Sequence, residues 1–302
     1  MRATGVSLIL GSLIKKITVA LRVVPLMAAM AFGQSATNAD LTKAENLYKH
    51  TDFASSLALL DRRSSDAATN FLIGRNYFMM GEFKKSVEFL LKATDASPKN
   101  SDYMDWLGRA YGKRAETSNP LFAPGFASKA RQAFEKAVEL DPKNQDALGD
   151  LFDYYLEAPG FLGGGMDKAL GVAGQTAALD PAEGYFEQAK VAQKRKEFDL
   201  AEDHFHRALA IGPKQVGHVI ALARFLAMQG RIRESDAIFA EAQKANPNVA
   251  RIWFARADVF ISQKRNLDEA KALLEKYMSA SISVDDPPKD EARRLLKQAG
   301  GA

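Results

Sequence analysis

The chain has 302 residues, of which 47% are apolar and 26% are charged, a composition typical of globular rather than disordered proteins. The formal net charge is +4, but the first 33 residues hold four of the 41 basic residues and none of the 37 acidic ones. The rest of the chain is therefore neutral, which argues against a nucleic-acid partner. There is no cysteine, so disulfide scaffolds, zinc–thiolate sites, thiol nucleophiles and lipidated-cysteine anchors are excluded.

Residues 1–34 have the layout of a secretory signal peptide. Basic residues come first, an apolar run of about ten residues from Val23 to Phe32 follows, and small residues lead to Ala36. The run is shorter than the roughly 20 residues of a membrane-spanning helix. We therefore expect an exported chain, periplasmic or secreted after cleavage, with at most peripheral membrane contact. A membrane-attached N-terminus is the alternative, and the true start codon could lie downstream of Met1.

Internal repeats are visible in the remainder of the chain. Five prolines each follow a helical apolar pattern, at intervals of 32 to 44 residues, namely Pro98, Pro142, Pro181, Pro213 and Pro247. A small residue recurs early in the units, at Gly74, Gly108, Ala189, Ala223 and Ala257. A second helix alternates small and bulky residues, as in Ser86, Leu90 and Ala93. Such facing stripes predict two closely packed antiparallel helices per unit, each pair leaving an apolar face for the next to cover.

This pattern resembles that of tetratricopeptide repeat (TPR) proteins, whose unit has about 34 residues. Residues 67–100 and 216–249 fit best. The resemblance implies an all-α fold, a right-handed superhelical solenoid of stacked antiparallel helix pairs spanning residues 35–284. We expect seven units, at residues 37–66, 67–100, 101–144, 145–181, 182–215, 216–249 and 250–283, and a capping helix in residues 285–302.

Several positions depart from the repeat pattern. Arg63 in the first unit, Phe152 in the fourth and Tyr277 in the seventh occupy places where a small residue is expected, and the seventh unit has one extra residue near Asn266. In the tail, Leu295 and Leu296 would close the last apolar face, while basic residues meet water. We interpret that segment as a solubilising cap.

Units three and four are longer than the period, and both insertions fall between the two helices. The loops 118–128 and 158–166 each contain the tetrapeptide Ala-Pro-Gly-Phe. Equivalent turns lie on one edge of a solenoid, so we expect an apolar cluster there, formed by Leu121, Phe122, Phe126, Phe161, Leu162 and Met166. The cluster is either structural packing or a partner-binding patch, for which Phe122, Phe126, Phe161 and Leu162 are the candidates. We assign the glycines at 163–165 to turn geometry, because the spacing of a phosphate-binding loop is absent.

The resemblance also implies a binding groove. In TPR proteins the first helix of each unit lines the inner surface, and the residue after its small position points inward. The groove residues expected here are Arg75, Phe78, Trp106, Arg109, Asp153, Lys190, Arg224 and Asp258. Their mixed charge and aromatic surface suit a protein or peptide partner. The carboxylate clamp of one TPR subclass is not expected, because no asparagine follows the small position.

An acidic stripe runs along the first helix of unit four, with Asp146, Asp150, Asp153 and Glu157. It could face a basic ligand, or be neutralised internally by Arg109 and Lys113 before it and Lys190 and Lys194 after it. We favour internal pairing.

The sequence offers little for catalysis, since the four histidines are scattered and no metalloprotease or nucleophile-elbow motif occurs. No catalytic residue, metal or cofactor is expected. The favoured function is a non-enzymatic interaction scaffold that binds a protein or peptide in its groove or on the insertion edge. The alternative is an accessory or chaperone-like subunit of an envelope assembly or secretion complex, and an enzyme is a distant third.

Overall fold

The computed structural model describes residues 38–300, so the predicted signal peptide at 1–34 lies outside the described residues. The described part is all-helical and contains no strand, which confirms the predicted fold class. The first helices of the pairs are α1 (Asn38–Lys49), α3 (Ala67–Met79), α5 (Ser101–Thr117), α7 (Gln145–Glu157), α9 (Pro181–Lys194), α11 (Val216–Met228) and α13 (Ala250–Ser262). The second helices are α2 (Phe53–Ala58), α4 (Phe83–Ala96), α6 (Ala123–Leu140), α8 (Met166–Leu179), α10 (Phe198–Ile211), α12 (Ile232–Ala245) and α14 (Leu267–Ser279).

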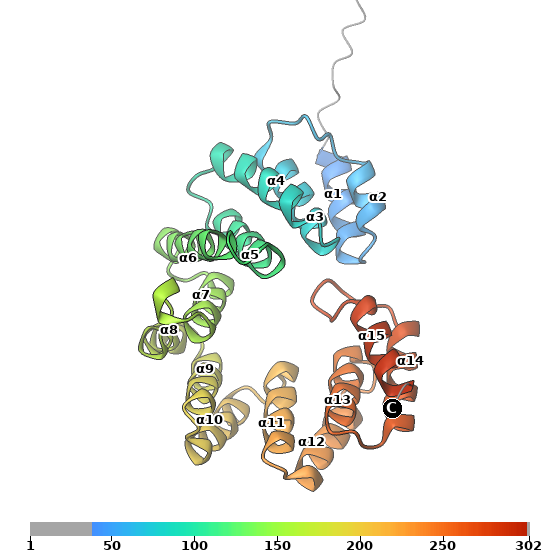
Figure 1. Ribbon diagram of the computed structural model, residues 1–302. Helices are drawn as coiled ribbons and strands as arrows, with labels where there is room; N and C mark the ends of the chain where they lie inside the picture. The colour runs from blue at the N-terminus through green and yellow to red at the C-terminus, as the bar shows by residue number, and fades with distance from the viewer. Residues whose placement is uncertain (1–37, 301–302) are drawn as a thin grey trace, which may run out of the picture. The chain divides into compact units, whose positions relative to one another are not determined.

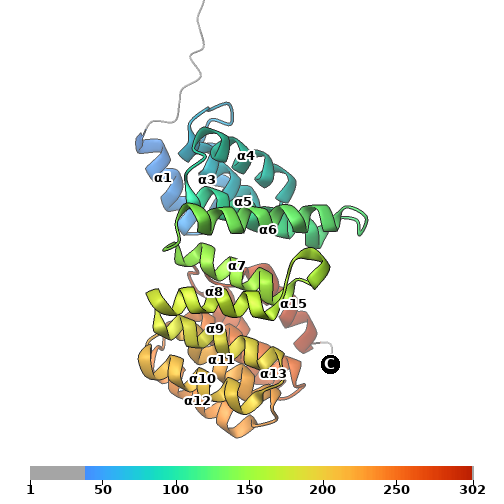
Figure 2. The ribbon, with the colours of Figure 1, turned by 90° about the vertical axis from the view of Figure 1, so that its left-hand side faces the viewer.

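The helix pairs are stacked side by side along a curve. Figure 1 shows α3, α5, α7, α11 and α13 on the inner side of this curve, with α4, α6, α8, α12 and α14 on the outer side. Figure 2 shows the same stack from the side, with successive pairs lying in layers. The first helices therefore supply the side chains of the concave surface.

Short polar residues set where the first helices begin. The side chains of Asp66, Asn100, Asn144 and Asp180 accept hydrogen bonds from free backbone N–H groups in the first turns of α3, α5, α7 and α9. Such caps satisfy donors that a helix start otherwise leaves open. These four caps fix where α3, α5, α7 and α9 start, whereas α11 and α13 begin without a side-chain cap.

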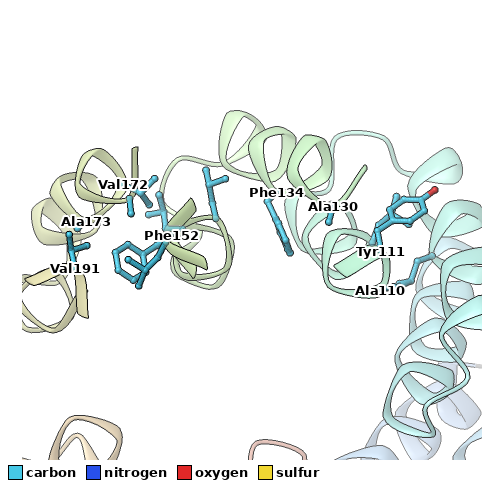
Figure 3. Packing of buried hydrophobic residues seen from close by; sticks show 14 residues of the cluster. Ala110, Tyr111, Ala130, Phe134, Phe152, Val172, Ala173 and Val191 are labelled. Atoms are coloured by element: carbon cyan, nitrogen blue, oxygen red, sulfur yellow. The ribbon is translucent and has the colours of Figure 1, made fainter. Parts of the chain in front are cut away.

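Small residues are needed where the two helices of a pair touch. A Cβ placed on Gly74 would lie 2.6 Å from Cγ of Leu90, and one on Gly108 would lie 2.6 Å from the ring of Phe134. Figure 3 shows Phe134 and Ala130 of α6 pointing toward α5. The alternation of small and bulky residues therefore brings the helix axes close together, as the repeat pattern predicts.

Two of the three bulky residues at expected small positions are buried in the core. Phe152 on α7 is buried, and it packs in the same cluster as Val172 and Ala173 of α8 and Val191 of α9 (Figure 3). Tyr277 on α14 is also buried, beside Phe254 of α13. The terminal unit differs, because the side chain of Arg63 is 81% exposed.

The first insertion is shorter than expected, because the loop prediction for residues 118–128 is wrong over its second half. Ala123, Pro124, Gly125 and Phe126 form the start of α6, where proline at the first positions lacks an N–H that the helix could not use. In the second insertion, the same tetrapeptide at 158–161 follows the end of α7, with Ala158 as its C-cap, and its last two residues belong to the 3₁₀-helix η1 (Gly160–Leu162). Identical residues therefore end one helix and begin another.

Glycine is required in the second insertion, as the sequence predicts. Gly163 has a φ of +89°, a left-handed conformation, and Gly165 has a φ of +157° before the first turn of α8. Gly164 lies so close to α7 that a Cβ there would come within 1.8 Å of the Ala158 carbonyl oxygen. These three glycines fold the loop tightly against the end of α7.

The C-terminal helix α15 (Lys289–Gly300) covers the apolar side of the last pair. Its Ala292 and Leu295 are buried in the cluster formed by α13 and α14. The loop before it is held by two hydrogen bonds, from Arg251 to the Asp285 carbonyl and from the Tyr277 hydroxyl to the Pro287 carbonyl. Val284 of this loop packs against the core formed by α1, α2, α3 and Phe89, so the segment joins the last unit to the first.

Candidate functional site

The concave surface carries a chain of contacts between neighbouring first helices. On α3, the Arg75 guanidinium lies 4.2 Å from the ring centre of Tyr48 on α1 and 4.8 Å from that of Trp106 on α5. Phe78 meets the Trp106 ring edge-on, with centres 5.4 Å apart. Arg75 is thus held by aromatic faces that favour a cation.

Arg109 on α5 is shared by two carboxylates. Its Nε lies 3.0 Å from Asp105 on the same helix and donates a hydrogen bond to Asp150 on α7, while its guanidinium covers the Trp106 ring. Asp105 is only 1% exposed and one of its oxygens has no hydrogen-bond partner. Burial raises the pKa of Asp105 to about 8, and the neighbouring Asp150 carboxylate adds to the rise. Burial also raises the pKa of Asp150, so the two carboxylates keep a proton between them at neutral pH.

The acidic stripe on α7 is partly neutralised by basic residues of neighbouring first helices. Lys190 on α9 donates to Asp153, and Lys194 donates to Glu157 at 2.6 Å. Together with the Arg109 pair, these contacts confirm the predicted internal pairing for three of the four acids. Lys113 pairs with Glu116 on its own helix instead. No cation in residues 38–300 forms an ion pair with the remaining acid, which is Asp146.

The other expected groove residues pair further along the surface. Arg224 on α11 donates to Asp258 on α13 at 2.9 Å. Helices α9 and α11 are also in contact. His218 on α11 lies face to face with Phe186 on α9, with ring centres 4.5 Å apart. The Nε2 atom of His218 is 2.8 Å from the Glu183 carboxylate, also on α9. From α5 to α13, each inner helix is thus joined to the next by hydrogen bonds or ion pairs as well as by packing.

Glu187 on α9 is the most unusual acid of this surface. The residue is 2% exposed, and neither carboxylate oxygen has a hydrogen-bond partner. Burial raises its pKa to about 8, with Glu183 and Asp153 acting in the same direction and the nearby Thr176 hydroxyl and Lys190 acting in the opposite one. Because an unpaired buried carboxylate is costly, Glu187 holds a proton at neutral pH unless a cation reaches it.

Three cavities follow one another along the concave surface. The first, here the apolar cavity, has a volume of about 610 Å³ and is lined by α3, α5, α6, α7 and the second insertion, including Phe78, Gly112, Phe134, Tyr154 and Leu162. The second, the acidic cavity, has about 470 Å³ between α7 and α9, with lining carboxylates Asp146, Asp150, Asp153, Asp180, Glu183 and Glu187 and lining cations Arg109 and Lys190. The third, the C-terminal cavity, has about 630 Å³ and is lined by α9, α11, α13 and residues 285–287.

The cavities share walls. Arg109, Asp150 and Asp153 line both the apolar and the acidic cavity, and Phe186 and Lys190 line both the acidic and the C-terminal cavity. Most of the predicted groove residues therefore gather at these cavities. Arg75, Trp106 and Asp258 do not line them, and Arg75 and Trp106 support the wall around Arg109 instead.

The residues of the insertion edge take different places. Phe126 is half-buried and stacks near Tyr111, with ring centres 6.4 Å apart, while Leu162 lines the apolar cavity. Leu121, Phe122 and Phe161 are 80%, 61% and 83% exposed. Because these three side chains are largely exposed, the six predicted residues do not form one buried cluster.

Of the two buried acids at the heart of the site, Asp105 is expected from the sequence to lie beside the inward-facing positions of the groove, whereas Glu187 is not among the predicted groove residues. A signal is present in the sequence: Asp105 lies one helical turn before Arg109, and Asp150 and Glu187 both stand two residues before the small position of their units. Charged residues inside an apolar stripe are otherwise rare. The burial of Glu187 depends on the approach of α7 and α8 to α9, which spacing along one helix does not give.

The described residues offer neither a transmembrane helix nor a metal site. None of the helices between residues 38 and 300 combines the length and the apolarity needed to cross a membrane. Over the same residues, no three or more His, Cys, Asp or Glu side chains are grouped as metal ligands would be. The carboxylates of the acidic cavity are thus not arranged as a metal centre.

Stacked helix pairs with a concave inner surface define this chain as a helical-repeat protein. Models of the tetratricopeptide repeat match residues 192–259 and residues 67–100 and 127–144, which confirms TPR repeats in the chain. A search of curated proteins finds no match.

Solved structures share the fold at low sequence identity. A TPR protein of Parabacteroides merdae is 14% identical with a TM-score of 0.57, and the match covers 87% of this chain and 98% of that one. A thermophilic TPR protein of Thermus thermophilus is 19% identical with a TM-score of 0.52, over 62% and 97% of the two chains. An APC/C hetero-tetramer subunit is 17% identical with a TM-score of 0.50, over 87% and 49%. These likenesses establish the helical solenoid.

Proposed function

We propose that this chain is a non-enzymatic scaffold that binds an extended segment of a partner protein along its concave surface. TPR solenoids generally mediate protein–protein interaction through such surfaces. The observation that carries the proposal is the row of three cavities with shared walls, which run from α3 to α13. A polypeptide in extended form can place successive side chains into neighbouring cavities.

The chemistry of the cavities favours a polypeptide over a small apolar ligand. The apolar cavity offers ring surface from Phe78, Phe134 and Tyr154, which suits a large apolar side chain. The acidic cavity beside it is lined mainly by charged and polar residues. A ligand that satisfies both needs apolar and polar groups at intervals of a few ångströms, as a peptide has.

A random peptide library displayed on phage tests this proposal. We expect the purified solenoid to enrich related sequences, and Gly112→Phe to abolish their binding by filling the apolar cavity. A Cβ on Gly112 meets nothing within 4 Å, so the ring enters the cavity without displacing the helix. Gly125→Phe is the matched control, since Gly125 has equally free space but lines none of the three cavities. Enriched peptides that bind the Gly112→Phe variant as well as the parent would refute binding at this surface.

We further propose that the chain is exported, which rests on the order of basic, apolar and small residues at its start. The mature protein is then expected in the soluble periplasmic or extracellular fraction, with a new N-terminus near residue 35. N-terminal sequencing and cell fractionation test this. An intact Met1 would contradict export by cleavage, and co-purification with a membrane complex would favour the accessory-subunit function.

A further inference from the structure

We propose that the acidic cavity is a recognition pocket for a basic side chain, the charged end of an arginine or lysine of the bound partner. This inference rests on the proposed function, because it names one side chain of the segment that the concave surface holds. It assigns to Glu187 the role of the residue at the bottom of the pocket that contacts the cation.

The geometry of the cavity supports a ligand there. Glu187 lines the cavity although it is 2% exposed, and both of its oxygens lack hydrogen-bond partners. The Thr176 hydroxyl next to it, on α8, is also buried without a partner. The Thr176 hydroxyl can act on Glu187 as a hydrogen-bond donor but can donate only one bond, so the two Glu187 oxygens keep acceptor capacity that an incoming donor would satisfy.

The charge around the cavity selects a cation. Six carboxylates and two cations line it, and Arg109 and Lys190 are already paired with Asp150 and Asp153. Of the other four acids, Asp180 caps α9 and Glu183 lies against His218. Among the described residues, Asp146 and Glu187 form no ion pair. These two acids have no cationic partner, and a basic side chain of the bound partner would supply a third positive charge beside Arg109 and Lys190.

An organic cation fits this site better than a metal ion does. The carboxylates are not grouped as metal ligands within residues 38–300. The cavity of about 470 Å³ has room for a guanidinium or ammonium group with part of its stem. Phe152 and Phe186 in its wall supply apolar surface for the methylene groups. The apolar cavity begins on the other side of Arg109, so a neighbouring apolar residue of the same segment would lie there.

Binding of a cation is linked to a proton. The groups that face Glu187 are Glu183 and Lys190 of its own helix, Asp153 of α7 and the Thr176 hydroxyl of α8. Because the pKa of Glu187 is about 8 in the empty site, a cation that binds at pH 7 displaces the carboxyl proton into the solvent. Proton release on binding is therefore a signature that a merely structural Glu187 would lack.

Isothermal titration calorimetry with N-acetyl-arginine amide tests the proposal, with N-acetyl-citrulline amide as the uncharged probe of nearly the same shape. We expect the arginine probe to bind and to release a proton at pH 7, measured as a heat that changes with the ionisation enthalpy of the buffer. Glu187→Gln should weaken binding about tenfold or more and abolish the proton release. Lys190→Gln should instead tighten binding, because it removes the cation that competes for Asp153.

The matched control is Glu139→Gln, which removes an exposed carboxylate from α6 outside the cavity and should leave binding unchanged. Equal binding of the two probes, no binding of the arginine probe, or normal binding by Glu187→Gln would overturn the proposal. The proposed function fails separately. If the selected peptides lose binding to Gly112→Phe but share no basic residue, the proposed function stands and the basic-residue pocket is refuted. If the library yields no enriched peptides at all, the proposed function itself is refuted.

Discussion

At the level of single residues, the concave surface contains buried carboxyl groups whose hydrogen bonding is incomplete. Asp105 and Glu187 are almost fully buried, and each has at least one oxygen without a hydrogen-bond partner. Buried ionised groups without full pairing reduce stability. Both sites hold a proton at neutral pH, but Asp105 and Asp150 also share the Arg109 cation, whereas no cation within residues 38–300 forms an ion pair with Glu187.

Replacement of Glu187 by glutamine is expected to change the pH dependence of stability. The pKa of Glu187 is raised from 4.5 to about 8, so its stabilising protonated form is fully present below pH 4.5 and is lost as the pH rises through about 8. The neutral amide removes this loss. We expect the free energy of unfolding of Glu187→Gln to exceed that of the parent by roughly 2 kcal/mol at pH 9. The difference between the two proteins should be smaller at pH 6. Urea denaturation at both pH values measures this.

A flat difference between the Glu187→Gln variant and the parent from pH 5 to pH 9 would contradict the assignment. Glu139→Gln on α6 serves as the control, because Glu139 is exposed and its stability difference should stay near zero at every pH.

Arg109→Met is expected to lower the free energy of unfolding by about 3 kcal/mol, because the change leaves Asp105 and Asp150 buried without their cation. The same substitution at Arg75 removes a cation from the faces of Tyr48 and Trp106 but strips no carboxylate of its partner, so we expect a loss of about 1 kcal/mol. Chemical denaturation of the two variants compares them directly. Equal losses would show that the carboxylates do not depend on Arg109.

At the level of helices, close approach determines which positions must stay small. A Cβ on Gly184 of α9 would lie 2.3 Å from the Cβ of Ala177 on α8, whereas a Cβ on Gly171 of α8 meets nothing within 4 Å. We expect Gly184→Ala to destabilise the fold by about 1–3 kcal/mol through forced separation of α8 and α9. Gly171→Ala should stabilise it by up to about 1 kcal/mol through helix propensity. Thermal unfolding of both variants tests the pair, and a stable Gly184→Ala variant would refute this contact.

The C-terminal helix should behave as a cap. Leu295 is buried against α13 and α14, and Leu296 beside it is only partly buried. We expect Leu295→Ala to cost about 2–4 kcal/mol and Leu296→Ala clearly less, because the loss follows the apolar area and the cavity left behind. Urea denaturation ranks the two variants. A larger effect at Leu296 would mean that α15 packs with another face.

Helices and their close contacts were open to prediction because they depend on residues that are near in sequence. Small residues opposite bulky ones, as Gly108 opposite Phe134, can be recognised from spacing alone. The insertions were harder, because the same tetrapeptide starts α6 in one unit and leaves α7 in the next. The outcome depends on the chain around it, since Gly163 and Gly165 allow positive φ in the second insertion only.

The candidate site was predictable only in part, for a related physical reason. The inward residues Arg109, Asp153 and Lys190 follow from helix periodicity, and the structure pairs them across helices. The burial of Glu187 results from how close α7 and α8 come to α9, which involves residues from two units. Side chains that gain their properties from such tertiary contacts carry no distinct signal within one helix.

At the level of the whole described chain, the concave surface combines rigid walls with unfilled space. Neighbouring first helices are joined by the pairs Arg109–Asp150, Lys190–Asp153 and Arg224–Asp258. The segment before α15 contributes residues 285–287 to the C-terminal cavity while its Val284 packs on the first unit. The cavities are therefore held open by contacts that do not themselves need a ligand, as expected for a preorganised binding surface.

Photo-crosslinking of a library-selected peptide tests the central claim most directly. Benzoylphenylalanine is placed either at Lys113, which lines the apolar cavity, or at Lys136 on α6, which lines none of the three cavities. Mass spectrometry then locates the crosslinked peptide. We predict efficient crosslinking from position 113 and none above background from position 136. Crosslinking from position 136 alone would contradict binding on the concave surface.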